Sequence, residues 1–308
     1  MATATANTQD ITKKTFKRRL EDFWRYVKRN PSLGVGIALF LTLFLFVAIG
    51  YATYEVERYR PLSGGPDLAP FEKDPYNPTT RAGGYILGTD RQGRDVMAVM
   101  IAGIPLTLQI GLIAGLIGIS VGTILAFMVA YYGGWIDQVI STIVDVGLTI
   151  PGILILIVIA VNLQSGLTVP QMGLAVSAVA WVWPARTIRS QVLVMREKLY
   201  VEIARLSGTS GFSIMFKEML PNLAPYIGAS LVGSVASAIL ASVGLEALGL
   251  GPFDSPTLGM TIYWNIQISS ILHGMWWWFG PPILVLAMIF VGLFLMTAGL
   301  DEWSKNER

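Results

Sequence analysis

The stretch YVEIARLSGTSGFSIMFKEMLPN, residues 200–222, is the longest charged island between uncharged parts of the chain. A polar insert of this kind cannot lie in hydrocarbon, so it must lie on one side of a membrane. Ala204 and Gly208 are four residues apart, which gives a helix one smooth side, and Gly208 can end that helix in a left-handed turn. A second short helix fits residues 210–219 and is expected to stop at Pro221. The stretch therefore predicts a compact helical knob that docks to another protein.

Composition places the rest of the chain in a membrane. Hydrophobic residues make up 53% of the 308 residues and charged residues 14%, a balance typical of a polytopic membrane protein. The chain has no cysteine, which excludes disulfides and thiolate metal sites, and its single histidine, His273, excludes a multi-histidine metal site. We therefore expect an all-α polytopic membrane protein without a metal site.

Six transmembrane helices are expected, because a span needs about 20 mainly apolar residues. They fit residues 31–54, 104–131, 139–163, 172–188, 224–245 and 279–300, and the third is interrupted at a Pro-Gly pair. The chain then divides into a basic amphipathic segment at 1–30, the first span at 31–54, an outer loop at 55–95, a five-helix core at 96–300 with a coupling loop at 190–222, and a tail at 301–308.

Basic residues predict the orientation of these spans. Residues 1–30 hold eight Lys and Arg side chains before the first span, residues 186–217 hold six, and the tail holds two. Because positive residues collect on the cytoplasmic side, both termini and the coupling loop are expected there. The other six basic residues lie in the long outer loop, to which this rule applies more weakly. The protein is thus expected to be a multi-pass protein of the cell's inner (cytoplasmic) membrane.

Four polar residues within or beside the spans are candidates for the translocation path or its gate: Asp145, Ser237, Ser242 and Glu246. Acids inside a membrane are functional candidates by default, although Asp145 lies near the cytoplasmic end of its span, where a structural role is the alternative. Glu246 fits an outer-gate residue and an interface residue equally well. Both serines belong to a fifth span rich in Gly, Ala and Ser, which permits either tight packing or the passage of a polar solute.

The outer loop contains four charged residues that are candidates for extracytoplasmic contacts: Asp90, Arg91, Arg94 and Asp95. The alternative is that they pair with one another. The stretch 250–276 has only two ionisable groups and could dip partly into the membrane against protein. Residues 276–278 are three consecutive tryptophans, which indicate an interfacial belt, with sugar stacking as the alternative.

Several motifs resemble one family. The spacing Glu202-x-Ala204, Gly208 and Leu220-Pro221 resembles the docking-loop signature of permease subunits of binding-protein-dependent ABC importers, with Ile203 and Glu218 departing from that signature. Residues 87–96, LGTDRQGRDV, resemble a segment of the dipeptide/oligopeptide branch, as do residues 132–137 and 248–251. The resemblance implies a type I ABC importer permease fold.

The resemblance also implies partners and roles. A second, similar permease, two ATP-binding subunits, an extracytoplasmic solute-binding protein and the lipid bilayer are expected partners, and nucleic acid is not. Six residues would couple to the ATPase: Glu202, Ala204, Arg205, Gly208, Leu220 and Pro221. ATP and magnesium would be bound by the partner subunits, because this chain has no phosphate-binding Gly-x-x-x-x-Gly-Lys-Ser/Thr loop and no cofactor site of its own. No catalytic constellation is present either, so the chain is expected not to be an enzyme.

The substrate stays open at this level. The branch carries di- and oligopeptides, while similar permeases carry oligosaccharides and nickel complexes. An ion-coupled secondary transporter is the alternative from another class, although that class usually shows buried coupling charges or repeated halves. A membrane enzyme is the third hypothesis, and it lacks any catalytic motif.

Overall fold

A computed structural model of the chain describes residues 25–75, 84–163 and 167–306. Within these ranges the regular elements are helices and no β-strand is present, which confirms the expected all-α polytopic fold. The elements in chain order are α2 (Pro31–Thr53), η1 (Val56–Tyr59), α3 (Val96–Tyr132), α4 (Gly134–Thr149), α5 (Gly152–Asn162), α6 (Val169–Ala180), α7 (Val182–Arg196), α8 (Leu199–Leu206), α9 (Gly211–Ser213), η2 (Ile214–Met219), α10 (Leu220–Ala247), α11 (Leu258–Gln267) and α12 (Trp276–Asn306).

Four of the described helices are long and apolar enough to cross a membrane: Pro31–Thr53, Val96–Tyr132, the continuous helix Gly211–Ala247, and Trp276–Trp303. A fifth span results if α4 and α5, which are bent by 86° at their junction, count as one. The expected span at 172–188 is present as two consecutive helices, α6 and α7, with only Trp181 between them. Trp181 itself has helical dihedrals, φ −80° and ψ −21°, so the backbone hardly departs from a helix there.

The break between α4 and α5 lies where the sequence predicts it. Ile150 is extended, with φ −81° and ψ 126°, and Pro151 follows as the residue before α5. A residue before proline is driven out of the helical region by the proline ring, so α4 ends at Thr149. The apolar chain therefore changes direction inside the expected third span.

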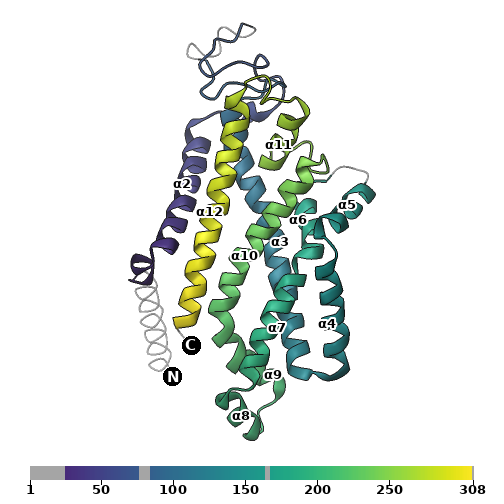
Figure 1. Cartoon of the computed structure of the whole chain (residues 1–308). Coiled ribbons are helices and arrows are strands. Elements are labelled where there is room, and N and C mark those ends of the chain that lie inside the picture. Colours follow the sequence, from purple (N-terminus) through teal and green to yellow (C-terminus); the bar gives the residue numbers. More distant parts are fainter. Residues whose placement is uncertain (1–24, 76–83, 164–166, 307–308) are drawn as a thin grey trace, which may run out of the picture.

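Helix α3 runs through the middle of the bundle, with α2 and α12 on one side and α4, α6 and α7 on the other (Figure 1). Glycines let it approach its neighbours closely. A Cβ atom on Gly118 would lie 2.8 Å from the carbonyl oxygen of Ala180, and one on Gly122 would lie 2.7 Å from the Cβ of Pro184. Any larger side chain at these two positions would force α3 away from α6 and α7.

The bundle has two distinct ends (Figure 1). One end carries the described part of the outer loop, residues 55–75 and 84–95, which we call the cap. The other end carries α8, α9 and η2, residues 197–219, which we call the lobe. The residues before α2 lie at the lobe end of α12, because the Tyr26 hydroxyl donates to the Gly299 carbonyl (2.9 Å) and the Asn30 amide donates to Glu302 (2.6 Å). The expected amphipathic segment at 1–30 lies outside the described residues except for residues 25–30.

One expected boundary, the start of the tail at residue 301, differs from the structure. Helix α12 continues to Asn306, so residues 301–306 extend the last helix instead of forming a separate tail.

The three tryptophans at the start of α12 do not share one environment. Trp276 is exposed, whereas Trp278 is 1% exposed and belongs to the core, and the Trp277 ring N–H donates to the Thr89 carbonyl of the cap (3.3 Å). The prediction of an interfacial belt is therefore wrong for Trp278, which is buried in protein, while Trp277 is half-buried against the cap.

Candidate functional site

The lobe begins with helix α8, which ends as its glycine predicts. Gly208 has φ +76°, in the left-handed region, and its N–H donates to the Arg205 carbonyl (3.1 Å). The next N–H, of Thr209, donates to the Ala204 carbonyl (3.1 Å), which satisfies the last turn of the helix. A Cβ atom on Gly208 would meet nothing within 4 Å, so the position requires glycine for its backbone and leaves open space around it.

The second half of the lobe differs from the expected short helix that stops at Pro221. Residues 214–219 form a π-helix, and the chain stays helical from Gly211 to Ala247. Pro221 is the second residue of α10, which follows directly on this π-helix, so the helix continues past the proline. The Leu220 N–H donates to the Met215 carbonyl five residues back, so a wide turn precedes the proline. The lobe is therefore continuous with α10.

One face of the lobe is packed firmly against the bundle. Val201, Ile214 and Met219 are fully buried and contact residues of α3 and α7 in one apolar cluster. Directly before the lobe, a guanidinium nitrogen of Arg196, the last residue of α7, donates to the Ala130 carbonyl near the end of α3 (3.0 Å). Because this contact is dense and apolar, a force on the lobe reaches α3, α7 and α10 without an intervening flexible loop.

The other face of the lobe is exposed and apolar at its tip. Five large apolar side chains are more than half exposed: Leu199 (69%), Ile203 (54%), Leu206 (82%), Phe212 (63%) and Phe216 (52%). The coupling candidates Glu202, Arg205, Gly208 and Pro221 are also exposed, while Ala204 and Leu220 are half-buried. Apolar residues gathered beside charges at the end of a bundle are typical of a protein-binding surface.

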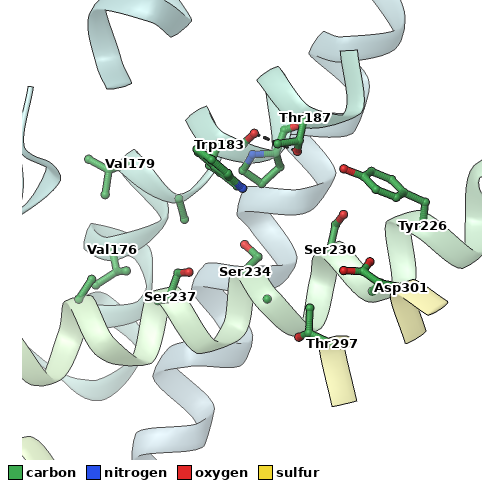
Figure 2. Close-up of a pocket in the computed structure, with 16 residues that line it drawn as sticks. Val176, Val179, Trp183, Thr187, Tyr226, Ser230, Ser234, Ser237, Thr297 and Asp301 are labelled. Atoms are coloured by element: carbon green, nitrogen blue, oxygen red, sulfur yellow. Dashed lines mark hydrogen bonds between the residues drawn. The ribbon is translucent and has the colours of Figure 1, made fainter. Parts of the chain in front are cut away.

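A groove of about 470 Å³ lies on the side of the bundle, between α6 and α7 on one wall and the end of α12 on the other. Helix α10 forms its floor (Figure 2). The α10 residues that line the groove include Tyr226, Ser230, Gly233, Ser237 and Ala241, which recur every three or four positions and so share one helix face. The Gly, Ala and Ser residues of the fifth span thus leave space on that face.

Hydroxyl groups make the groove partly polar. They come from α7, α10 and α12, and they belong to Thr187, Tyr226, Ser230, Ser234, Ser237 and Thr297. One acid, Asp301, also lines the groove at the end of α12 (Figure 2). Sequence reasoning included Ser237 among the path candidates and missed the others. The spacing of hydroxyls at 226, 230, 234 and 237 could have indicated this face.

The remaining path candidates lie outside the groove. Ser242 is fully buried and its hydroxyl donates to the Ile239 carbonyl (3.0 Å). Asp145 is exposed and pairs with Arg186 (2.7 Å) across a separate pocket of about 130 Å³ between α4 and α7. A second pair, Asp137 with Arg189 (2.7 Å), joins the same two helices. The acids of α4 therefore compensate arginines of α7.

Glu246 is fully buried at the end of α10, in a network with the start of α11. Its Oε2 atom accepts from the Met260 N–H (3.0 Å) and from the Thr257 hydroxyl, while Oε1 has no partner among the described residues. A Cβ atom on Gly259 would lie 2.8 Å from the Cβ of Glu246, so the glycine makes room for the acid. Of the two interpretations from sequence, this position favours a residue that joins two elements over one that faces solute.

In the cap, three of the four extracytoplasmic contact candidates are internal. Asp90 accepts from the Arg94 side chain (2.5 Å), and both are at most 5% exposed. Asp95 is fully buried. Its carboxylate accepts one hydrogen bond from the Met97 N–H at the start of α3 (3.0 Å) and another from the Tyr54 hydroxyl (2.5 Å). Burial raises the pKa of Asp90, and the neighbouring Arg94 opposes that rise. Only Arg91 is exposed, paired with Asp67, so the expectation of partner contacts by the other three is corrected to structural pairing.

Metal binding receives no support from the described residues. Among them, no group of three or more His, Cys, Asp or Glu side chains lies close enough to hold a metal ion. The described residues instead form two notable features: an exposed lobe at one end of the bundle, and a groove lined by hydroxyl groups and one acid. A helical bundle with these two features fits a subunit of a membrane transporter.

Comparison with known proteins is consistent with this class. Residues 118–304 match the family described as "Binding-protein-dependent transport system inner membrane component". The dipeptide transport system permease protein DppC of Bacillus subtilis is 28% identical over 95% of this chain and 87% of its own length. The oligopeptide transport system permease protein OppC of Lactococcus lactis is 31% identical over 68% of this chain and 72% of its own. The glutathione transport system permease protein GsiD of Pectobacterium atrosepticum is 28% identical over 78% and 76%.

The chain therefore belongs to the family of binding-protein-dependent transport system inner membrane components. It is a multi-pass membrane protein and a permease subunit of an ABC importer, and ATP hydrolysis falls to a separate subunit.

Proposed function

We propose that this permease subunit imports di- and oligopeptides in a complex with a second, similar permease, two ATP-binding subunits and an extracytoplasmic solute-binding protein. The peptide assignment is supported by the relatives, whose names include dipeptide, oligopeptide and glutathione transport. The single observation that best supports this assembly is the structure of the lobe. Its tip is apolar and exposed, while its other face is packed into the bundle.

The lobe would receive the movement of an ATP-binding subunit. Glu202, Arg205 and Gly208 are exposed near the tip, beside the apolar side chains of Ile203 and Leu206. A cleft on the ATPase that closes on ATP binding would grip these side chains. Because η2 continues directly into α10, a displacement of the lobe would tilt the helix that forms the floor of the groove.

The groove would form half of the solute path. It is open along the side of the bundle between α7 and α12, and a second permease of similar shape would close it. Hydroxyl side chains suit a peptide, because they exchange hydrogen bonds with amide groups without binding them strongly. Ser237, which is exposed within the groove, is the path candidate best placed for such contact.

The lobe would face the cytoplasm of the cell's inner membrane. Basic residues support this orientation, because eight precede the first span and six lie between residues 186 and 217. Hydrogen bonds of Tyr26 and Asn30 to the end of α12 keep the described residues before α2 at the lobe end. The cap would then face the solute-binding protein, with Arg91 exposed on it.

Uptake by the reconstituted complex tests the proposal. The chain would be purified with its co-assembling subunits from native membranes, placed in liposomes with the co-purifying binding protein, and supplied with labelled tripeptides and internal ATP. We expect uptake that requires ATP and the binding protein. Uptake of oligosaccharide instead of peptide would reject the substrate, and uptake driven by a proton or sodium gradient without ATP would reject the ATP-driven assembly.

A further inference from the structure

The groove is lined by one charged side chain, that of Asp301. Asp301 lines the groove from the last turns of α12 and is half-buried. Among the side chains that the structure describes, which on α12 end at Trp303, Asp301 has no ion-pair partner. The three arginines of α7, which lies across the groove, are each paired with another acid: Arg186 with Asp145, Arg189 with Asp137, and Arg196 with Glu197.

The carboxylate of Asp301 lies beside the hydroxyl groups that line the groove. In Figure 2 the side chain lies near Ser230 and Thr297, on the same side of the space as Tyr226. The Thr297 hydroxyl already donates to the Leu293 carbonyl (2.9 Å). A half-buried carboxylate in a membrane protein is costly unless water or a cation meets it, and acids placed this way usually mark a solute path.

We propose that Asp301 makes the groove selective for solutes that carry a positive charge, such as a protonated amine. The inference rests on the proposed function in so far as the groove is a solute path. The carboxylate acts as a long-range attraction and does not clamp the solute, because it is the one charged residue of the lining and the other polar groups there are hydroxyls. An anionic solute of the same size would be disfavoured at the same point.

A labelling experiment tests the electrostatic part without any knowledge of the substrate. The chain has no native cysteine, so Ser230→Cys places one thiol in this chain, inside the groove. In membranes containing the whole complex, its labelling rates with a cationic and an anionic methanethiosulfonate of similar size would be compared. We expect the cation-to-anion rate ratio to fall about fivefold when Asp301→Asn is added, because the cation should react about twofold more slowly and the anion about twofold faster, the order for a unit charge acting through water at about 8 Å. An unchanged ratio would overturn the proposal.

A matched control uses the adjacent acid. Glu302→Gln removes the same charge one residue further along α12, but Glu302 does not line the groove and its carboxylate accepts from Asn30. This variant should leave the cation-to-anion ratio within a factor of two of the parent. If Glu302→Gln lowers the ratio as much as Asp301→Asn, the effect comes from general surface charge, and the proposal fails.

A transport experiment tests selection itself. Three tripeptides, Ala-Ala-Lys, Ala-Ala-Gln and Ala-Ala-Glu, share one amino terminus and differ in side-chain charge. Comparing variants with the same binding protein cancels that protein's own preference. Asp301→Asn should lower the lysine-to-glutamate uptake ratio about fivefold, and Asp301→Lys should lower it further. An equal loss for all three peptides would overturn the selectivity. If the unaltered complex imports none of them, the peptide assignment fails, while the labelling result still decides the proposal.

Discussion

Replacing Arg94 by methionine would measure how much the buried ion pair between Arg94 and Asp90 stabilises the cap. In the native protein the Arg94 side chain donates to Asp90 (2.5 Å), and two backbone N–H groups, of Gln92 and of Arg94 itself, donate to the same carboxylate (2.8 and 2.9 Å). The variant keeps the two backbone donors and the apolar volume, and it removes the only positive charge that the described structure places on Asp90. The carboxylate then stays buried without a counter-ion.

Removing one partner of a buried pair costs about 3 kcal/mol or more, which corresponds to at least about a hundredfold increase in opening of the cap. The cost depends on pH. Burial already raises the pKa of Asp90, and loss of Arg94 removes the main opposing effect, so the pKa rises further. An acid whose pKa is raised on folding stabilises the fold below its unfolded pKa of about 4, and this contribution is lost as pH rises through the folded value. The variant should therefore be closest to the native protein in acid.

Hydrogen exchange of the purified complex measures this opening. The backbone N–H groups of Thr89 and Asp90 are bonded within the cap, to the Leu68 and Arg94 carbonyls, and they report on it. After correction for intrinsic exchange, we expect the protection lost in Arg94→Met to be larger at pH 8 than at pH 5. The control is Arg91→Met, which removes an exposed pair and should cost less than about 1 kcal/mol. Native protection in Arg94→Met at pH 8, or a larger loss at pH 5, would refute the reasoning.

Three further variants test other parts of the structure. Gly208→Asp strains a backbone at φ +76° by about 1 kcal/mol and adds a charge to the tip of the lobe, so ATP-dependent uptake should be abolished while the protein still reaches the membrane; normal uptake would contradict this. Gly118→Leu places atoms within 2.8 Å of the Ala180 carbonyl and should destabilise the complex by about 1–3 kcal/mol, measured as a lower temperature of thermal aggregation. Ser237→Trp should fill the groove and lower uptake at least about tenfold, whereas Leu240→Trp, exposed on another face of α10, should not.

Local chemistry made several features predictable from the sequence. Gly208 ends its helix because a left-handed residue there is far easier for glycine, and Pro151 breaks the third span because the residue before a proline leaves the helical region. Both effects depend on one or two residues of the backbone. The apolar runs of the long helices depend only on composition over about 20 residues, so those spans were also predictable.

Features set by packing between distant segments were not predictable. A proline usually ends or kinks a helix, but here a wide turn at residues 214–219 precedes Pro221 and the helix continues past it. Trp278 is buried because the cap and α11 cover it, and nothing in a run of three tryptophans indicates that cover. Asp301 faces the groove because α12 continues past the expected end of the span at residue 300. In each case the neighbour that decides the outcome is far away in the chain.

The docking of the lobe to an ATP-binding subunit is the central claim, and site-directed crosslinking tests it most directly. The chain has no native cysteine, so Leu206→Cys, at a side chain 82% exposed on the lobe, and Leu62→Cys, at one 92% exposed on the cap, each provide one reactive position in this chain. After treatment of native membranes with a short thiol-to-amine crosslinker, the adducts would be identified by mass spectrometry. We expect Leu206→Cys, and not Leu62→Cys, to link this chain to an ATP-binding subunit. An ATPase adduct from the cap position, or none from the lobe position in a complex that hydrolyses ATP, would contradict the account.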